Sequence, residues 1–196
     1  MEFTKADQLD FDPRPAMGKI FAEGFYQWLQ YFSKDREKLA KGLAHSFELA
    51  AFWVAVKDGK VLALTGCTDR SKPAMALNKK ELKKHLGFIG GTMAHIFLNK
   101  MMVNKPLPFA LEPGTGYIDF VAADSQHRGQ GIAYQLMERA MKKEGYQKYV
   151  LEVVDNNHSA IKLYTKLGFQ TFLKVPEKNA KRAGFENYLY MEKDRC

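Results

Sequence analysis

The nonapeptide SQHRGQGIA, residues 125–133, places two glycines beside an arginine at the junction of two differently patterned segments. The run before it, YIDFVAAD at 117–124, is apolar and β-prone, which predicts a strand. The run after it, GIAYQLMERAMKKEGY at 131–146, has apolar residues at helical spacing. The first amides of a helix lack intrahelical acceptors and carry partial positive charge, and glycine lets a ligand approach them. The stretch therefore predicts a strand, a loop suited to an anion, and a helix.

Two widespread phosphate-binding motifs do not fit this loop. A Walker loop requires Lys followed by Ser or Thr after its last glycine, and here Ile132 and Ala133 follow. The dinucleotide fingerprint finds its first two glycines, and Glu152 lies where a ribose-binding acid is expected. Its third glycine position is Tyr134, however, which is too large for close helix–strand packing. From the loop alone, the alternative that it is a glycine-containing connection without a ligand stays open.

A second patterned stretch, NNHSAIKLYTKLGF at 156–169, predicts a helix that leads into a strand. Asn157 is a favourable N-cap and Gly168 a favourable C-terminal stop. The positions that share one helix face are Ala160, Ile161, Tyr164 and Leu167. On the residues alone, Tyr164 is a core-facing tyrosine whose hydroxyl needs a partner.

Together the two stretches resemble the GNAT superfamily of acyl-CoA-dependent N-acetyltransferases. The loop fits that family's Arg/Gln-x-x-Gly-x-Gly/Ala pattern, and the second stretch fits its Asn-x-x-Ala-x-x-x-Tyr-x-x-x-Gly-Phe pattern. The positions matched in the second pattern are Asn157, Ala160, Tyr164, Gly168 and Phe169. The resemblance extends over residues 118–193, and the apolar hairpin around 57–60 matches only in outline. Ser125 stands where the family often has proline, and residues 1–50 and 73–113 show no motif of the family.

The resemblance implies acetyl-CoA as cosubstrate, with its pyrophosphate held on main-chain amides of the loop. The residues implied in this cradle are Arg128, Gly129, Gln130, Gly131, Ile132 and Ala133. It also implies main-chain contacts of Val121 and Ala123 with the pantetheine arm and the acetyl carbonyl, and a coenzyme contact by Asn157. Tyr164 is implied as the general acid that protonates the departing thiolate, because a tyrosine pKa of about 10 is near that of an alkyl thiol. Two alternatives stay open: Asn157 only caps the helix, and Tyr164 only packs in the core.

Direct acetyl transfer to an amine, with no acyl-enzyme, needs a base for the amine proton, supplied by a side chain or by water. Asp119 and Glu152 each stand on an otherwise apolar face of an expected strand, which marks either a functional acid or the point where the strand leaves the core. Both are therefore candidate bases, Glu112 in the preceding loop is a third, and a water chain could replace all of them. The histidines show no metal-ligand spacing, and no metal is expected.

The whole pattern predicts one α/β domain over residues 1–196, with a helical insertion at 73–113. The order of elements predicts a mixed sheet with at least one parallel pair, and the resemblance implies that this sheet is mostly antiparallel and carries helices on both faces. Strands are expected at 2–5, 52–56, 61–66, 117–124, 149–155, 169–175 and 187–193. Helices are expected at 16–32, 34–47, 79–85, 92–102, 131–146 and 158–168, the second of them capped by Ser33.

The net charge of +8 favours an anionic partner. The lysines at 79–84 accompany no helix-turn-helix or RNA-binding motif, so coenzyme phosphates are expected in preference to nucleic acid. A non-catalytic acyl-CoA-binding or sensory protein on the same fold, and a basic nucleic-acid-binding protein, are the alternatives. Two distant cysteines, an N-terminus without an apolar leader and no bilayer-length apolar run predict a cytoplasmic protein without a membrane partner.

The amine acceptor is not identified by any motif. An aromatic stripe at helical spacing suggests the hypothesis that the acceptor is an amine with an apolar body, although such a stripe usually belongs to a core. The aromatic residues expected near the acceptor are Phe21, Phe25, Tyr26, Trp28 and Tyr31. A monomer and a homodimer both fit the sequence.

Overall fold

The computed structural model describes residues 1–195. Its strands are β1 (Glu2–Lys5), β2 (Phe52–Lys57), β3 (Lys60–Thr68), β4 (Thr115–Ala123), β5 (Lys148–Val154), β6 (Gln170–Pro176) and β7 (Asn187–Asp194). Its α-helices are α1 (Arg14–Gly24), α2 (Tyr26–Leu29), α3 (Arg36–Ala44), α4 (Lys79–Leu98), α5 (Ile132–Glu144), α6 (His158–Lys166) and α7 (Ala180–Ala183). Short turns join them, among them η3 (Asn99–Val103), which has π-helical geometry. Across residues 1–195 there is no helix with the length and apolar character needed to cross a bilayer.

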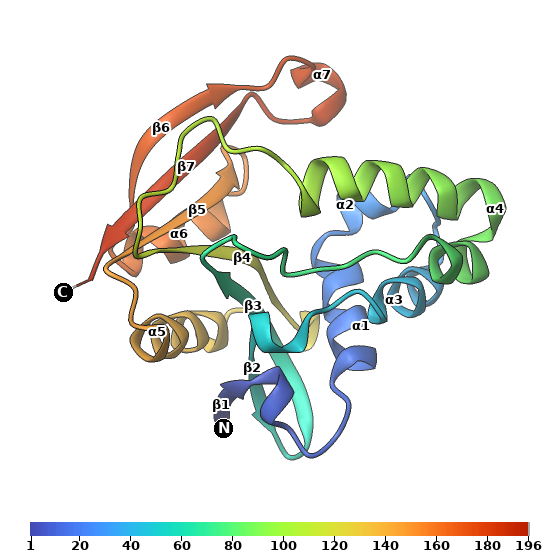
Figure 1. The fold of residues 1–196 in the computed structure, drawn as a ribbon, viewed down its shortest axis with the longest axis horizontal. Helices are drawn as coiled ribbons and strands as arrows, with labels where there is room; N and C mark the ends of the chain where they lie inside the picture. The colour runs from blue at the N-terminus through green and yellow to red at the C-terminus, as the bar shows by residue number, and fades with distance from the viewer. Residues whose placement is uncertain (196) are drawn as a thin grey trace.

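The strands form one 7-stranded sheet in the order β1-β2-β3-β4-β5-β7-β6. Every neighbouring pair is antiparallel except β4–β5, which α5 connects as the crossover that a parallel pair requires. The mixed, mostly antiparallel sheet with one parallel pair is thus confirmed. The β6–β7 hairpin, with α7 at its tip, stands at one end of the sheet (Figure 1).

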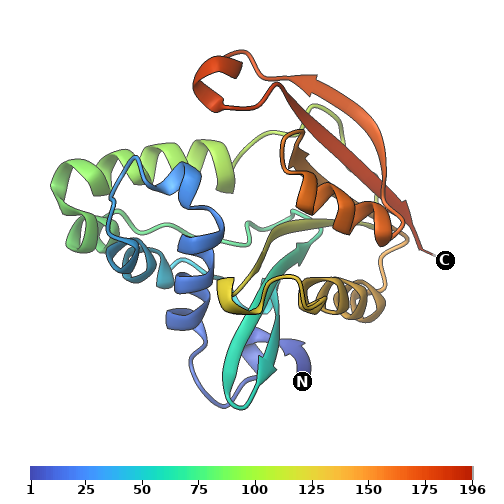
Figure 2. The same ribbon diagram turned by 180° about the vertical axis from the view of Figure 1, so that it is seen from behind.

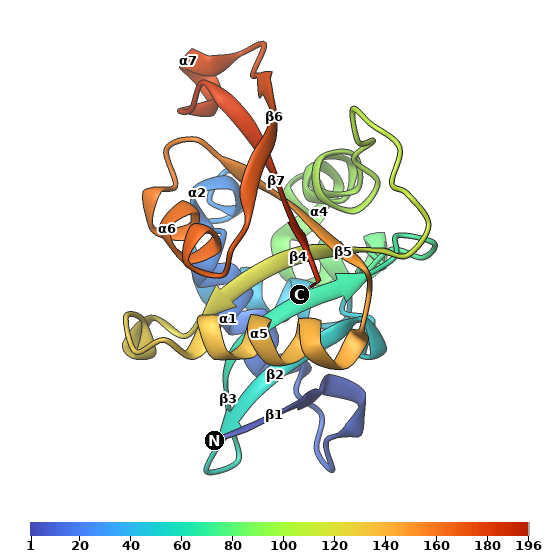
Figure 3. The same ribbon diagram turned by 90° about the vertical axis from the view of Figure 1, so that its left-hand side faces the viewer.

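Helices cover both faces of the sheet, as expected, and each face has its own apolar core. The first core lies between α1–α4 and the strands and includes Phe21, Leu43 and Phe52. The second lies beneath α5 and α6 and includes Leu136 and Tyr149. Figures 1 and 2 show the first four helices grouped together, apart from α5 and α6, and Figure 3 shows α5 lying across β2, β3 and β4.

The parallel pair β4–β5 separates part of the way along its length. The paired register ends at Ile118 of β4 and Leu151 of β5. Just beyond, β4 carries a bulge opposite Thr65 of β3, where Phe120 adopts a φ of 54°. A side chain in the left-handed region costs on the order of 1–3 kcal/mol, so the surrounding packing must hold it there. The rings that pack against Phe120 are Phe21, Phe25 and Phe52.

Two helix boundaries in the N-terminal part differ from those expected. The expectation that Ser33 caps the second helix is wrong: the Asp35 carboxylate accepts hydrogen bonds from the amides of Glu37 and Lys38, and α3 begins at Arg36. The expected long helix at 16–32 is divided at Phe25 into α1 and α2.

The segment at 73–113 holds α4, which consists of two helical halves that meet at a kink, in agreement with the two helices expected there, although the second half begins earlier than expected. Gly87 is non-helical, with φ 76° and ψ 171°, so α4 is kinked at the point where the sequence pattern breaks. From η3 the chain continues without regular structure to β4. The outer face of the second half of α4 is apolar and exposed, at Phe88, Ile89, Met93, Ile96 and Phe97.

A substitution at Gly18 tests how closely α1 and α3 cross. A Cβ at this position would lie 2.5 Å from the carbonyl oxygen of Ala40, so a methyl group forces the helices apart. We expect Gly18→Ala to lower the free energy of unfolding by about 1–3 kcal/mol, as overpacking typically does. The control Gly42→Ala meets nothing nearer than 3.4 Å, and the helix preference of alanine should make it neutral or stabilising by up to about 1 kcal/mol. Urea unfolding followed by circular dichroism measures both, and equal effects would contradict the close crossing.

Candidate active site

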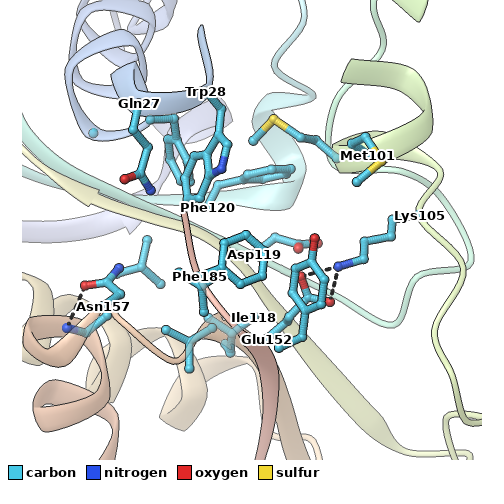
Figure 4. Close-up of a pocket in the computed structure, with 18 of the residues that line it drawn as sticks. Gln27, Trp28, Met101, Lys105, Ile118, Asp119, Phe120, Glu152, Asn157 and Phe185 are labelled. Carbon is cyan, nitrogen blue, oxygen red and sulfur yellow. Dashed lines mark hydrogen bonds and ion pairs between the residues drawn. The ribbon is translucent and has the colours of Figure 1, made fainter. Parts of the chain in front are cut away.

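A pocket of about 230 Å³ lies where β4 and β5 separate (Figure 4). Ile118, Val153 and Tyr164 line it from the core beneath α5 and α6. Phe25 and Phe120 line it from the core beneath α1–α4. Because residues of both cores line it, the pocket extends from one face of the sheet to the other.

Two of the three candidate bases, Asp119 and Glu152, lie in this pocket, on the face opposite α5 and α6. Glu152 alternates with Leu151 and Val153, which belong to the second core, so its side chain points the other way. Asp119 likewise follows Ile118 of that core, and Figure 4 shows its carboxylate directed to the side that Glu152 occupies. The two acids were selected in the sequence because each lies on an otherwise apolar strand face, and in the structure they lie in one cavity.

Burial raises the pKa of Asp119 to about 7. The nearby Glu152 carboxylate adds to this rise in pKa, while the Arg70 guanidinium opposes it. Arg70 is anchored by a 2.7 Å hydrogen bond from Nη2 to the carbonyl of Lys105 and lies over the ring of Tyr117, with Cζ 4.7 Å from the ring centroid. Asp119 is therefore a carboxyl group that can exchange a proton near neutral pH.

Glu152 forms an ion pair with Lys105, which comes from the irregular segment before β4. The Lys105 Nζ lies 2.6 Å from both carboxylate oxygens and 3.4 Å from the centroid of the Tyr188 ring. Tyr190, the partner of Glu152 in the β5–β7 register, lies alongside. Burial first, and then hydrogen bonding to Glu152, raises the pKa of Tyr190 well above its usual range.

Tyr164 faces the pocket from α6. The Asn157 side chain caps this helix by accepting a 3.2 Å hydrogen bond from the amide of Ala160, as expected, and it also lines the pocket. Burial raises the pKa of Tyr164 well above its usual range, and no charge or hydrogen bond from another described residue contributes to the shift. Burial thus holds the Tyr164 proton more tightly than in a free tyrosine, which moves its pKa away from that of an alkyl thiol.

The rest of the pocket wall is largely apolar. Its large apolar side chains are Phe25, Trp28, Phe97, Met101, Met102 and Phe185. Phe25 and Trp28 were among the aromatic residues expected near the acceptor. Phe21 is instead buried in the first core, and neither Tyr26 nor Tyr31 lines the pocket.

The glycine loop lies beyond the pocket, at the end of β4. Gly129 and Gly131 have φ values of 77° and 75°, a region that favours glycine, and a Cβ on Gly129 would meet nothing within 4 Å. Gly131 is the N-cap of α5, which has no side-chain cap, so the amides of its first turn are free. The exposed Arg128 lies beside them, while the Ile132 side chain is buried and only its main chain can face a ligand.

The pocket brings together one group of the residues expected from the sequence: Asp119, Val121, Glu152, Asn157 and Tyr164. A second group lies along the chain that leaves it: Ala123, Arg128, Gly129, Gln130, Gly131, Ile132 and Ala133. Glu112 is exposed, pairs with Lys148 at 3.7 Å and does not line the pocket. Among residues 1–195, no group of three or more His, Cys, Asp or Glu side chains is placed to hold a metal ion.

Among the polar residues of the pocket that were not expected from the sequence are Arg70, Lys105 and Tyr188. Arg70 and Lys105 lie in irregular segments, where no periodicity marks the direction of a side chain. Tyr188 lies on β7, opposite Val154 of β5, and its alternation with Tyr190 was the one available signal that both face Glu152.

The family model described as "Acetyltransferase (GNAT) family" matches residues 14–169. The N-alpha-acetyltransferase 30 of Schizosaccharomyces pombe is 42% identical over 63 residues, which are 31% of this chain and 42% of that protein. The chain thus spans less than half the length of this curated relative. An N-acetyltransferase from Staphylococcus aureus Mu50 has a similar structure, with a TM-score of 0.58 and 18% identity over 98% of this chain and 100% of that one. The ribosomal-protein-S18-alanine N-acetyltransferase from Escherichia coli also has a similar structure, with a TM-score of 0.56 and 16% identity over 98% of this chain and 92% of that one. At such identities the two structures show a shared fold.

The pKa of Asp119 predicts a pH-dependent stability. Between about 3.8 and about 7 the folded protein retains a proton that the unfolded chain loses, so stability falls as pH rises through this window. Asp119→Asn removes the cost of the buried charge and should stabilise the protein more at pH 8 than at pH 5, by about 1–3 kcal/mol. Urea unfolding at the two pH values measures this difference. The exposed carboxylate variant Asp10→Asn should show none, and an equal effect of Asp119→Asn at both pH values would contradict the elevated pKa.

Proposed function

Because the chain belongs to the acetyltransferase (GNAT) family, we propose that it transfers an acetyl group from acetyl-CoA directly to a primary amine. The observation that carries the proposal is a pocket joining both faces of the sheet, with Tyr164 on the α6 side and Asp119 and Glu152 on the other. Donor and acceptor can then approach one point from opposite sides, which holds the amine in line with the thioester. A cytoplasmic location belongs to the same proposal and suits the buried free thiol of Cys67.

The donor fits the α6 side of the pocket and the loop beyond it. Past Ile118 the β5-facing edge of β4 has no strand partner, so its main-chain groups can bond the amides of the pantetheine arm. This is the role proposed for Val121 and Ala123, with the Asn157 side chain as a further contact. The free amides at the start of α5 and the charge of Arg128 suit the pyrophosphate.

In the proposed mechanism Tyr164 supplies a proton to the departing thiol. Its hydroxyl is protonated at neutral pH, as that of an ordinary tyrosine is, and it lines the pocket from α6. The amine loses its proton on the other side, where the Asp119 carboxyl, with a pKa of about 7, can accept it. Glu152 is the fixed negative charge that attracts the acceptor ammonium.

The acceptor side favours an amine with an apolar body. The wall around Trp28, Phe97 and Met101 offers apolar surface, while Asp119 and Glu152 offer the charge that an ammonium needs. The N-terminal amine of a polypeptide belongs among the acceptors to be tried, since a relative of this chain is an N-alpha-acetyltransferase.

A thiol-release assay with acetyl-CoA and a broad amine panel tests the function. We expect acetyl-CoA to raise the melting temperature and CoA to be released with an acceptor, at higher kcat/KM for apolar-bodied amines than for small polar ones of similar basicity. Binding without CoA release from any amine would indicate a non-catalytic acyl-CoA-binding protein. Steeply salt-dependent DNA binding without a response to acetyl-CoA would instead revive a nucleic-acid-binding role.

Tyr164→Phe tests the general acid. We expect kcat to fall by at least about 100-fold, the lower range for general acid–base catalysis, with the thermal shift by acetyl-CoA almost unchanged. The control is Tyr149→Phe, which removes another buried tyrosine hydroxyl, one that bonds the Met141 carbonyl outside the pocket. It should lower stability and leave kcat near the wild-type value. A Tyr164→Phe protein with wild-type kcat would exclude the assignment.

A further inference from the structure

Lys105 brings a primary amine of the protein itself into the pocket. Its ammonium is bound by both carboxylate oxygens of Glu152 and by the face of the Tyr188 ring. The pair is largely enclosed, with exposed side-chain fractions of 20% and 19%. Figure 4 shows the Asp119 carboxylate directed to the same place.

Carboxylates and an aromatic face are the groups that bind an ammonium ion. An acceptor amine that enters this pocket would need the same contacts, since Glu152 and Asp119 are the lining carboxylates. Lys105 thus occupies the position that the proposed function gives to the substrate amine, across the pocket from Tyr164.

The backbone at Lys105 is anchored so that the side chain is presented there. Its carbonyl accepts the 2.7 Å hydrogen bond from Arg70, in a segment with no helix or strand of its own. The side chain, by contrast, is a flexible four-carbon stem that can move along the pocket without disturbing this bond.

Resting on the proposed function, we propose that Lys105 is an internal acceptor, which the protein acetylates when no other amine is present. The Lys105 Nζ attacks the acetyl carbonyl, a C–N bond forms and the thioester C–S bond breaks. The products are Nε-acetyl-lysine and CoA. The ammonium loses two protons: one leaves through Asp119 to solvent, and the other restores the Tyr164 hydroxyl after it has protonated the departing thiolate.

Acetylation would also change the state of the pocket. An acetylated lysine has no charge and cannot keep its ion pair with Glu152. The carboxylate is then free for the ammonium of an incoming acceptor. The internal reaction would therefore convert a pocket filled by its own amine into one that is open to substrate.

The experiment is peptide mass spectrometry of the whole protein after incubation with acetyl-CoA and no amine. We expect one acetyl group per chain on Lys105, at a rate independent of protein concentration because the transfer occurs within one chain. Lys148 is the matched control, because carboxylates also hold it, including Glu192 at 3.4 Å, but it lies outside the pocket. It should show only background chemical acetylation. Tyr164→Phe should slow the Lys105 reaction by the same factor as amine turnover and leave the Lys148 background unchanged.

Each outcome decides a separate point. Lys105 acetylation no faster than that of Lys148, with CoA release from the amine panel, overturns the internal acceptor and leaves the proposed function intact. No Lys105 acetylation, no CoA release and no thermal shift overturn both. A rate that rises with protein concentration shows transfer between chains and overturns the internal step.

The effect on the pocket has its own test. Lys105→Gln imitates the uncharged acetylated side chain, and we expect it to lower the KM for the acceptor amine several-fold relative to unacetylated wild-type protein, both measured in the first turnover after acetyl-CoA is added. Lys148→Gln is the control and should leave KM unchanged. An unaltered KM in Lys105→Gln would overturn the proposal that Lys105 competes with the substrate.

Discussion

The early separation of β4 and β5 is the constraint on which the site depends. If the two strands stayed hydrogen-bonded beyond Ile118 and Leu151, the sheet would be closed and no cavity could join its two faces. The bulge at Phe120 accompanies this separation and places a non-glycine residue at a φ of 54°. The aromatic rings of α1 and β2 pack against Phe120 and offset the cost. The first core therefore fixes the geometry of the pocket, although its own residues carry no chemistry.

The opening in the sheet also determines the electrostatics. It places two carboxylates in one enclosed space, where burial and the charge of Glu152 raise the pKa of Asp119. Arg70 opposes that rise, and Lys105 neutralises Glu152 directly. In the proposed mechanism Asp119 is the proton acceptor, chiefly because burial raises its pKa, and Glu152, which pairs with Lys105, is the binding charge.

Much of this arrangement follows from local patterns in the sequence. Asp119 and Glu152 could be selected because an acid on an apolar strand face is rare, and both the Asn157 cap and the pocket-facing Tyr164 follow from helix periodicity and a family pattern. The bulge at Phe120 could not be predicted, because it depends on the pairing of β4 with β3, which is distant in sequence. The position of Lys105 in the pocket could not be predicted for a related reason, because in an irregular segment only tertiary contacts determine where a side chain points. The cap of α3 was also missed, because Ser33 and Asp35 are both suitable capping residues and local preference does not distinguish them.

The two sides of the pocket come from different kinds of sequence. The residues suited to the donor lie on β4, the loop and α6, where the family patterns are found, and their main-chain geometry tolerates many side chains. The wall proposed for the acceptor is built by α2, the end of α4 and residues 99–105, which lie within the family-model match but carry neither of the two sequence motifs. Burial of an apolar body against that wall contributes roughly 25 cal/mol per Å² of apolar surface, whereas Glu152 recognises only the ammonium common to all amines. Under the proposed function, the choice among amines therefore depends on Trp28, Phe97 and Met101, and a change of acceptor requires substitutions there while the glycine loop stays as it is.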